Sequence, residues 1–78
     1  MPRFYFHIVH GETVIEDPDG SELPDLDTAR AEALQSARHL LADKVRNGEI
    51  VDGQRFEIRD GHGDLLATVA FKDAIRFS

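Results

Sequence analysis

Two stretches in which apolar and polar residues alternate enclose one long stretch with helical periodicity, and this order limits the folds open to the chain. Residues 3–9 and 54–59 alternate with a period of two, which indicates strands with one buried face. Each is followed by a turn that contains glycine and by a second apolar segment, at residues 13–16 and 65–71. We therefore expect two β-hairpins, one toward each end of the sequence.

Residues 26–46 lie between the hairpins and carry apolar side chains at helical spacing. Asp25 is the expected N-cap, because its carboxylate can accept a hydrogen bond from an unpaired amide at the start of a helix. Asn47 and Gly48 form the expected stop signal. Residues 17–27, with two prolines, are expected to form a connecting loop that leads into the helix. The apolar stripe of the helix consists of Leu26, Ala29, Ala33, Ala37, Leu40, Leu41 and Val45, with Leu34 at its margin.

The expected order of elements is β-β-α-β-β, in one domain, because a chain of 78 residues has room for one domain only. The simplest arrangement is a two-layer α+β fold, in which a four-stranded antiparallel sheet carries the helix on one face. The alanines of the stripe would let the helix approach the sheet closely. The sheet residues expected to face the helix are Phe4, Phe6, Ile8, Phe56, Ile58, Leu65, Ala67, Val69 and Phe71.

The chain has no cysteine, so neither a disulfide nor a thiolate–metal site can reinforce a core this small. Oligomerisation is the remaining common means of stabilising a small scaffold. We therefore expect a homodimer, or contact with another protein. No segment has the length and apolar character of a membrane span, and the N-terminus lacks the features of a signal peptide, so we expect a cytoplasmic protein.

The sheet face that the helix leaves uncovered is the best candidate for a functional surface. Antiparallel sheets tolerate one solvated face, and this face combines polar with apolar residues in a way that suits a partner. The residues predicted to form the interface are Arg3, Tyr5, His7, Arg55 and Arg59. The other residues expected on this face are Val9, Glu57, Leu66, Thr68 and Ala70.

A nucleic-acid-binding or regulatory function on the same face is the first alternative, because Tyr5 and the arginines could stack on bases. The charge disfavours it: the formal net charge is -6, and seven of the 15 acidic residues lie between Glu12 and Asp27 without a Lys or Arg among them. We interpret this stretch as a solvated loop that adds negative charge at the helix start. A calcium loop of the EF-hand type does not fit, because Ile15 and Leu26 would fall at ligand positions.

A weak metal-binding site is the second alternative, with His7, His10 or His62 and nearby acids as ligands. His7 and His10 are three residues apart, so in a regular strand they would point to opposite faces. His62 lies in the stretch "DGHGD", residues 60–64, where Asp and Gly suit a hairpin turn. We therefore predict no metal site.

Nothing in the sequence indicates catalysis. No serine lies in a nucleophile elbow. The Gly-His-Gly stretch precedes an expected strand rather than a helix, so it is not a dinucleotide-binding loop. A domain of this size also leaves little room for a pocket that would separate the pKa values of paired carboxylates. We expect a non-enzymatic protein without a cofactor.

Three segments together resemble a known family: the opening "MPRFYFHIVHG", the acidic "DPDGSELPDLDTARAEALQSARHLLAD" and the closing "LLATVAFKDAI". The family consists of short proteins, common in alphaproteobacteria, that are classed as a domain of unknown function. The resemblance extends over nearly the whole chain. It implies one small α+β domain, and it brings no activity and no catalytic residue that could be transferred.

Overall fold

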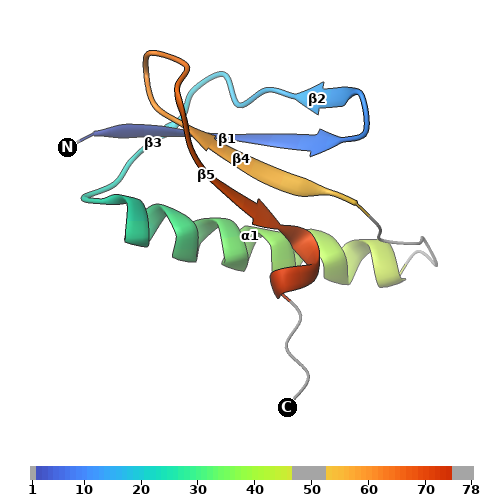
Figure 1. Ribbon diagram of the computed structural model, residues 1–78. Coiled ribbons are helices and arrows are strands. Elements are labelled where there is room, and N and C mark those ends of the chain that lie inside the picture. The colour runs from blue at the N-terminus through green and yellow to red at the C-terminus, as the bar shows by residue number, and fades with distance from the viewer. Residues whose placement is uncertain (1, 47–52, 75–78) are drawn as a thin grey trace.

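The computed structural model describes residues 2–46 and 53–74, and it confirms an α+β fold with one helix and an open antiparallel sheet (Figure 1). The expected elements occur in the expected order, and a short strand and a 3-10 helix are added to them. The elements are β1 (Arg3–His10), β2 (Thr13–Ile15), β3 (Ser21–Glu22), α1 (Leu26–Arg46), β4 (Arg55–Arg59), β5 (Leu65–Ala70) and η1 (Phe71–Ala74).

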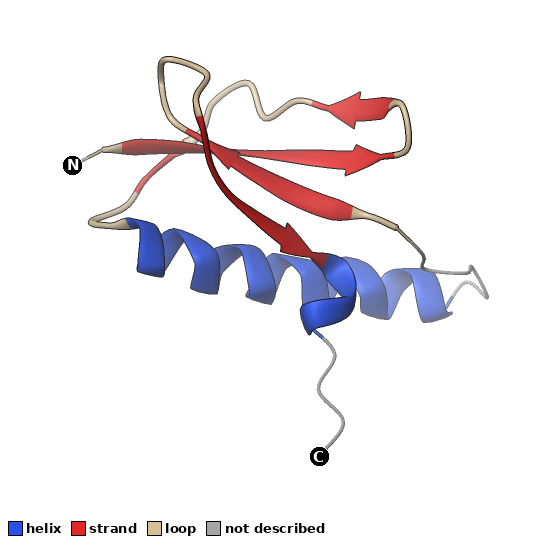
Figure 2. Cartoon of the chain, viewed as in Figure 1, coloured by secondary structure: helices blue, strands red, loops and turns tan. Residues whose placement is uncertain are grey.

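The sheet has the strand order β2-β1-β4-β5, and all neighbours are antiparallel (Figure 2). The two-residue strand β3 also pairs with β1, so the sheet has five strands rather than the four expected. The expected loop at residues 17–27 therefore contains a strand. It crosses back to the start of β1, where Arg3 lies opposite Glu22 and Phe4 lies opposite Ser21.

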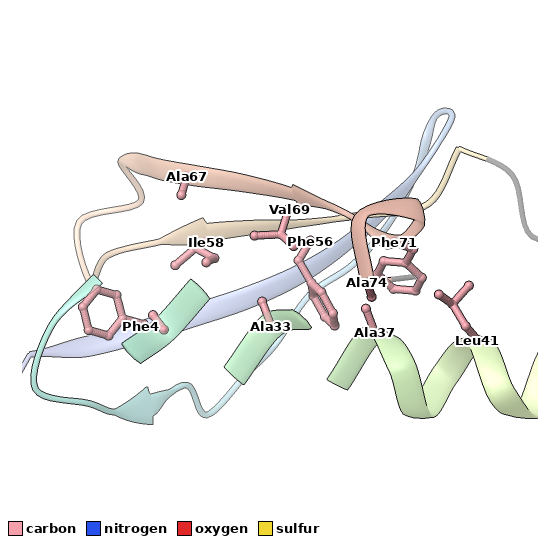
Figure 3. Close-up of a cluster of buried hydrophobic side chains, with 11 residues drawn as sticks. Phe4, Ala33, Ala37, Leu41, Phe56, Ile58, Ala67, Val69, Phe71 and Ala74 are labelled. Atoms are coloured by element: carbon pink, nitrogen blue, oxygen red, sulfur yellow. The ribbon is translucent and has the colours of Figure 1, made fainter. Parts of the chain in front are cut away.

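The core lies between α1 and one face of the sheet (Figure 3). The alanines at 29, 33 and 37 are buried at the contact, which confirms that small side chains bring the helix close to the sheet. The start of the helix is confirmed as well, because the Asp25 carboxylate accepts the Thr28 amide at 2.8 Å. The expected stop at residues 47–48 and the side chain of Val45 lie outside the described residues.

Phe71 was expected to end the last strand, but it begins η1 instead and remains buried. Its ring lies 4.9 Å from that of Phe56, measured between centroids. Arg38 of the helix donates a hydrogen bond from Nε to the Ala74 carbonyl at 3.1 Å, which fixes the end of η1 on α1. The 3-10 helix η1 therefore covers the core at the end of β5.

The prediction that Leu65 faces the helix is wrong. Ile58 lies opposite Ala67, whereas Arg59 lies opposite Leu65, so a β-bulge places Leu66 as an extra residue in β5. The bulge reverses the alternation before Ala67. Leu65 consequently shares the face of Arg59, and it is 50% exposed.

Val9 was expected to be an open residue of the uncovered face, yet it is only 4% exposed. The alternation of β1 places it on that face, and it is not part of the core cluster under the helix. Its cross-strand neighbours are Val14 on one side and Arg55 on the other. Val9 is therefore a buried apolar residue of this face, with Val14 on one neighbouring strand and Arg55 on the other.

Candidate functional site

The face of the sheet away from α1, which we call the open face, brings the predicted interface residues together. Tyr5 of β1 lies opposite Arg59 of β4, and Val9 lies opposite Arg55. Arg3 stands at the start of β1, beside β3. The residues of the open face are Arg3, Tyr5, His7, Val9, Val14, Arg55, Glu57, Arg59, Leu65, Thr68 and Ala70.

A row of alternating charges runs along β4. Glu57 lies between two arginines: its Oε1 accepts hydrogen bonds from Nη2 of Arg59 at 2.9 Å and from Nε at 3.3 Å, and its Oε2 lies 3.6 Å from Nη2 of Arg55. Arg59 also donates from Nη1 to the Gly63 carbonyl at 2.8 Å. The hydrogen bond from Arg59 lowers the pKa of Glu57, and partial burial opposes the shift. The row is thus fixed within the chain, and its two arginines share one carboxylate.

Tyr5 and His7 form a stacked pair on the neighbouring strand. Their ring centroids are 6.4 Å apart, and the ring planes differ by 24°. Nδ1 of His7 accepts the backbone N–H of Asp17 at 3.0 Å, so this nitrogen carries no proton in the observed contact. The same bond occupies the lone pair that a metal ion would need at Nδ1.

The turn at residues 17–20 is held against β1 by the carboxylate of Asp17. This carboxylate accepts the amide of Phe6 at 3.3 Å through Oδ2, and it accepts the amides of Asp19 and Gly20 at 3.3 and 3.1 Å through Oδ1. The bond to Phe6 fills the gap between β2 and β3 along β1. Asp17 is therefore a structural residue, whereas sequence reasoning treated it as part of a solvated acidic loop. The spacing Asp-x-x-Gly, typical of side-chain-closed turns, was the signal available.

Arg3 continues this edge of the face. Its guanidinium donates to the Asp19 carbonyl at 2.7 Å and to the Glu22 carboxylate at 3.0 Å. The two ends of the open face carry exposed apolar side chains, Val14 on β2 and Leu65 on β5. The face thus combines ordered polar groups with apolar residues at its borders.

The remaining histidines lie apart from His7. His62 is exposed in the turn between β4 and β5, where Oδ1 of Asp60 accepts the amides of His62 and Asp64 at 2.8 and 3.0 Å. The bond from the Asp64 amide is the main cause that lowers the pKa of Asp60. Within residues 2–46 and 53–74, no group of three or more His, Asp or Glu side chains is placed to hold a metal ion.

His10 lines a cavity of about 330 Å³ between the β1–β2 hairpin and α1. Sequence reasoning did not predict this cavity, because its shape depends on how the hairpin and the helix pack. Gln54 is buried at its wall, and Oε1 of Gln54 has no hydrogen-bond partner among the described residues. The lining residues are Ile8, His10, Thr13, Ile15, Leu40, Gln54 and Phe71.

Residues 3–72 match the family described as a domain of unknown function, DUF6894. Because the match covers most of the chain, the protein belongs to this family, as the resemblance of its three segments indicated. No curated protein and no solved structure matches the chain.

Helix α1 does not combine the length and the apolar character that crossing a membrane requires, and the same holds for every other helix in the described part of the chain.

Proposed function

We propose that the protein is a non-enzymatic module that acts in the cytoplasm through protein contacts, that it works as a homodimer, and that the open face is its contact surface. The observation that carries this proposal is the open face itself. It holds Tyr5, His7, Arg55 and Arg59 side by side on two central strands, with Arg3 at one border.

The side chains of this surface are held in place before any partner arrives. Stacking orders Tyr5 and His7, and ion pairs order Arg55 and Arg59 around Glu57. Binding therefore loses little side-chain entropy, which is a main cost of forming an interface. Tyr and Arg are also the residue types that most often contribute strongly to protein interfaces.

The charge pattern favours protein over nucleic acid as the partner. A phosphate backbone is bound by Lys and Arg side chains that are free to pair with phosphates and so displace the counterions of the nucleic acid. On the open face, Arg55 and Arg59 share one carboxylate and Arg3 is paired with Glu22. The net charge of -6 adds long-range repulsion.

Sedimentation velocity of the full chain, from low to high micromolar concentration, tests the homodimer. We expect the sedimentation coefficient to rise from that of a monomer to that of a dimer. A protein that sediments as a monomer over the whole range would overturn the homodimer. Titration with single-stranded RNA at low salt serves as the comparison, and there we expect no binding.

A further inference from the structure

We propose that two copies of the chain join by pairing their β5 strands edge to edge, so that one antiparallel sheet runs through both. This inference rests on the proposed homodimer but places its contact at the edge of the sheet, so that the open face stays available for contact with another protein. Strand β5 is the end of the path β2-β1-β4-β5, and no further strand of the described chain pairs with it. It also forms one border of the open face, through Leu65, Thr68 and Ala70.

The backbone register shows which groups of β5 are unused. The Phe71 amide donates to the Gln54 carbonyl at 3.0 Å, so these two residues form a hydrogen-bonded pair. In an antiparallel ladder such pairs alternate with pairs that are not bonded to each other. Val69 and Ala67 therefore turn their amides and carbonyls toward β4, whereas Thr68 and Ala70 turn theirs toward the free edge.

This edge lacks the features by which proteins usually block edge pairing. β5 has the sequence LLATVA, without a charge or a proline. The bulge affects only its start, at Leu66, and the register from Ala67 to Ala70 is regular. The opposite edge is different: β2 has three residues, and after it the chain is tied to β1 through Asp17.

The distribution of charge favours β5 over the opposite edge as the place where a second copy binds. Glu12, Glu16, Asp17, Asp19 and Glu22 follow β1 along the opposite edge of the sheet. Two copies of a chain with a net charge of -6 repel each other least when these acidic edges are farthest apart. Pairing at β5 places them at the two ends of the joined sheet and brings together two uncharged strands.

The pairing is self-complementary. An axis through Val69 places Thr68 of each copy opposite Ala70 of the other, which is the isologous contact that a two-fold dimer requires. The outward amides and carbonyls of these two residues would then all be paired. Tyr5 and His7, two strands away from the junction, would stay uncovered on both copies.

The test substitutes proline at matched positions of the two edges. Thr68→Pro removes an outward amide of β5 and leaves the bonds to β4 in place. Val14→Pro is the control. Val14 lies between Thr13 and Ile15, the residues of β2 that are hydrogen-bonded to β1, so its own amide points outward at the opposite edge. In sedimentation velocity we expect Thr68→Pro to weaken dimerisation by at least about tenfold, since each of the two copies loses the pairing bond of its residue 68 amide. We expect Val14→Pro to dimerise like the parent protein.

Two measurements on the unsubstituted protein keep the test independent of how the variants fold. Amide exchange by NMR should slow at Thr68 and Ala70 as the dimer forms. Tyr5 is the only tyrosine and the chain has no tryptophan, so intrinsic fluorescence reports on the open face alone. Quenching of Tyr5 by acrylamide should be the same in the dimer as in the dilute protein.

The outcomes separate this inference from the proposed function. A dimer with fast exchange at Thr68 and Ala70, or a dimer that Thr68→Pro leaves intact, would overturn β5 pairing while the homodimer stands. A dimer in which Tyr5 is protected from acrylamide would mean that two open faces stack, which also overturns β5 pairing. A parent protein that stays monomeric would overturn the homodimer and the inference with it.

Discussion

The backbone amide of Asp17 donates a hydrogen bond to Nδ1 of His7 at 3.0 Å, while the carboxylate of Asp17 accepts the amide of Phe6, the residue before His7, at 3.3 Å. His7 thus accepts the amide of the loop, and Asp17 in turn accepts an amide of β1. The two contacts tie the loop between β2 and β3 to the central strand. They give His7 and the Asp-x-x-Gly turn a structural role, independent of any partner on the open face.

Substituting Asp17 by Ala should destabilise the fold, because the amides of Phe6, Asp19 and Gly20 would lose their acceptor. Leaving partly buried donors without a partner costs about 1–3 kcal/mol. The free energy of unfolding, measured by urea denaturation, should fall by this amount. Asp19→Ala is the matched control, because the Asp19 carbonyl that Arg3 uses is retained, and it should change stability by less than about 0.5 kcal/mol. Equal losses in both variants would contradict a role for the Asp17 carboxylate.

Gly20 should resist substitution for a reason that Gly11 does not share. Both have positive φ angles, 69° and 61°. A Cβ on Gly20 would lie 2.9 Å from Arg3 Cγ, 2.9 Å from Tyr5 Cε2 and 3.0 Å from the Phe4 carbonyl oxygen, whereas a Cβ on Gly11 meets nothing within 4 Å. We expect Gly11→Ala to cost about 1 kcal/mol from backbone strain alone.

Gly20→Ala should cost about 1–2 kcal/mol more than Gly11→Ala, since β1 would have to shift away from the turn. Thermal unfolding followed by circular dichroism provides the comparison. Should the two variants have the same midpoint, the turn does not depend on close contact with β1.

Replacing Ile58, which is 0% exposed, should show how strongly the stability of the fold depends on a single core side chain. Ile58→Val removes one methylene and should lower the free energy of unfolding by about 0.5–1.5 kcal/mol. The same change at Ile15, which is 60% exposed on β2, should have almost no effect. Chemical denaturation of both variants decides this, and similar losses would mean that the hairpin edge is covered in solution.

The sequence predicted features that depend on neighbours along the chain and missed those that depend on contacts across the fold. The N-cap at Asp25 was predictable because its acceptor and the Thr28 amide are three residues apart. The outward position of Leu65 was not, because the bulge at Leu66 is a feature of how β5 pairs with β4. The faces of β1 followed from its alternation, but the contact between Asp17 and His7 joins residues ten positions apart.

The ion pairs of Glu57 should make stability decrease at acid pH. The pKa of Glu57 in the folded protein is lowered, chiefly by the hydrogen bond from Arg59, relative to a usual value of 4.5. A group with a lowered folded pKa contributes stability that is complete above the unfolded pKa and is lost as the pH falls through the folded pKa. The contribution of Glu57 to the free energy of unfolding should therefore be complete above its unfolded pKa and should be lost as the pH falls from there through the lowered folded pKa.

Glu57→Gln should flatten this acid slope, because glutamine does not take up a proton and cannot form the charged contact with Arg59. Glu32→Gln, on the exposed side of α1, is the control and should keep the slope of the parent protein. Urea denaturation at a series of pH values gives the slopes. The lowered pKa of Asp25, which arises from the Thr28 amide, leaves part of the slope in every variant. If Glu57→Gln and the parent protein lost stability in parallel, the row of charges on β4 would not contribute to folding.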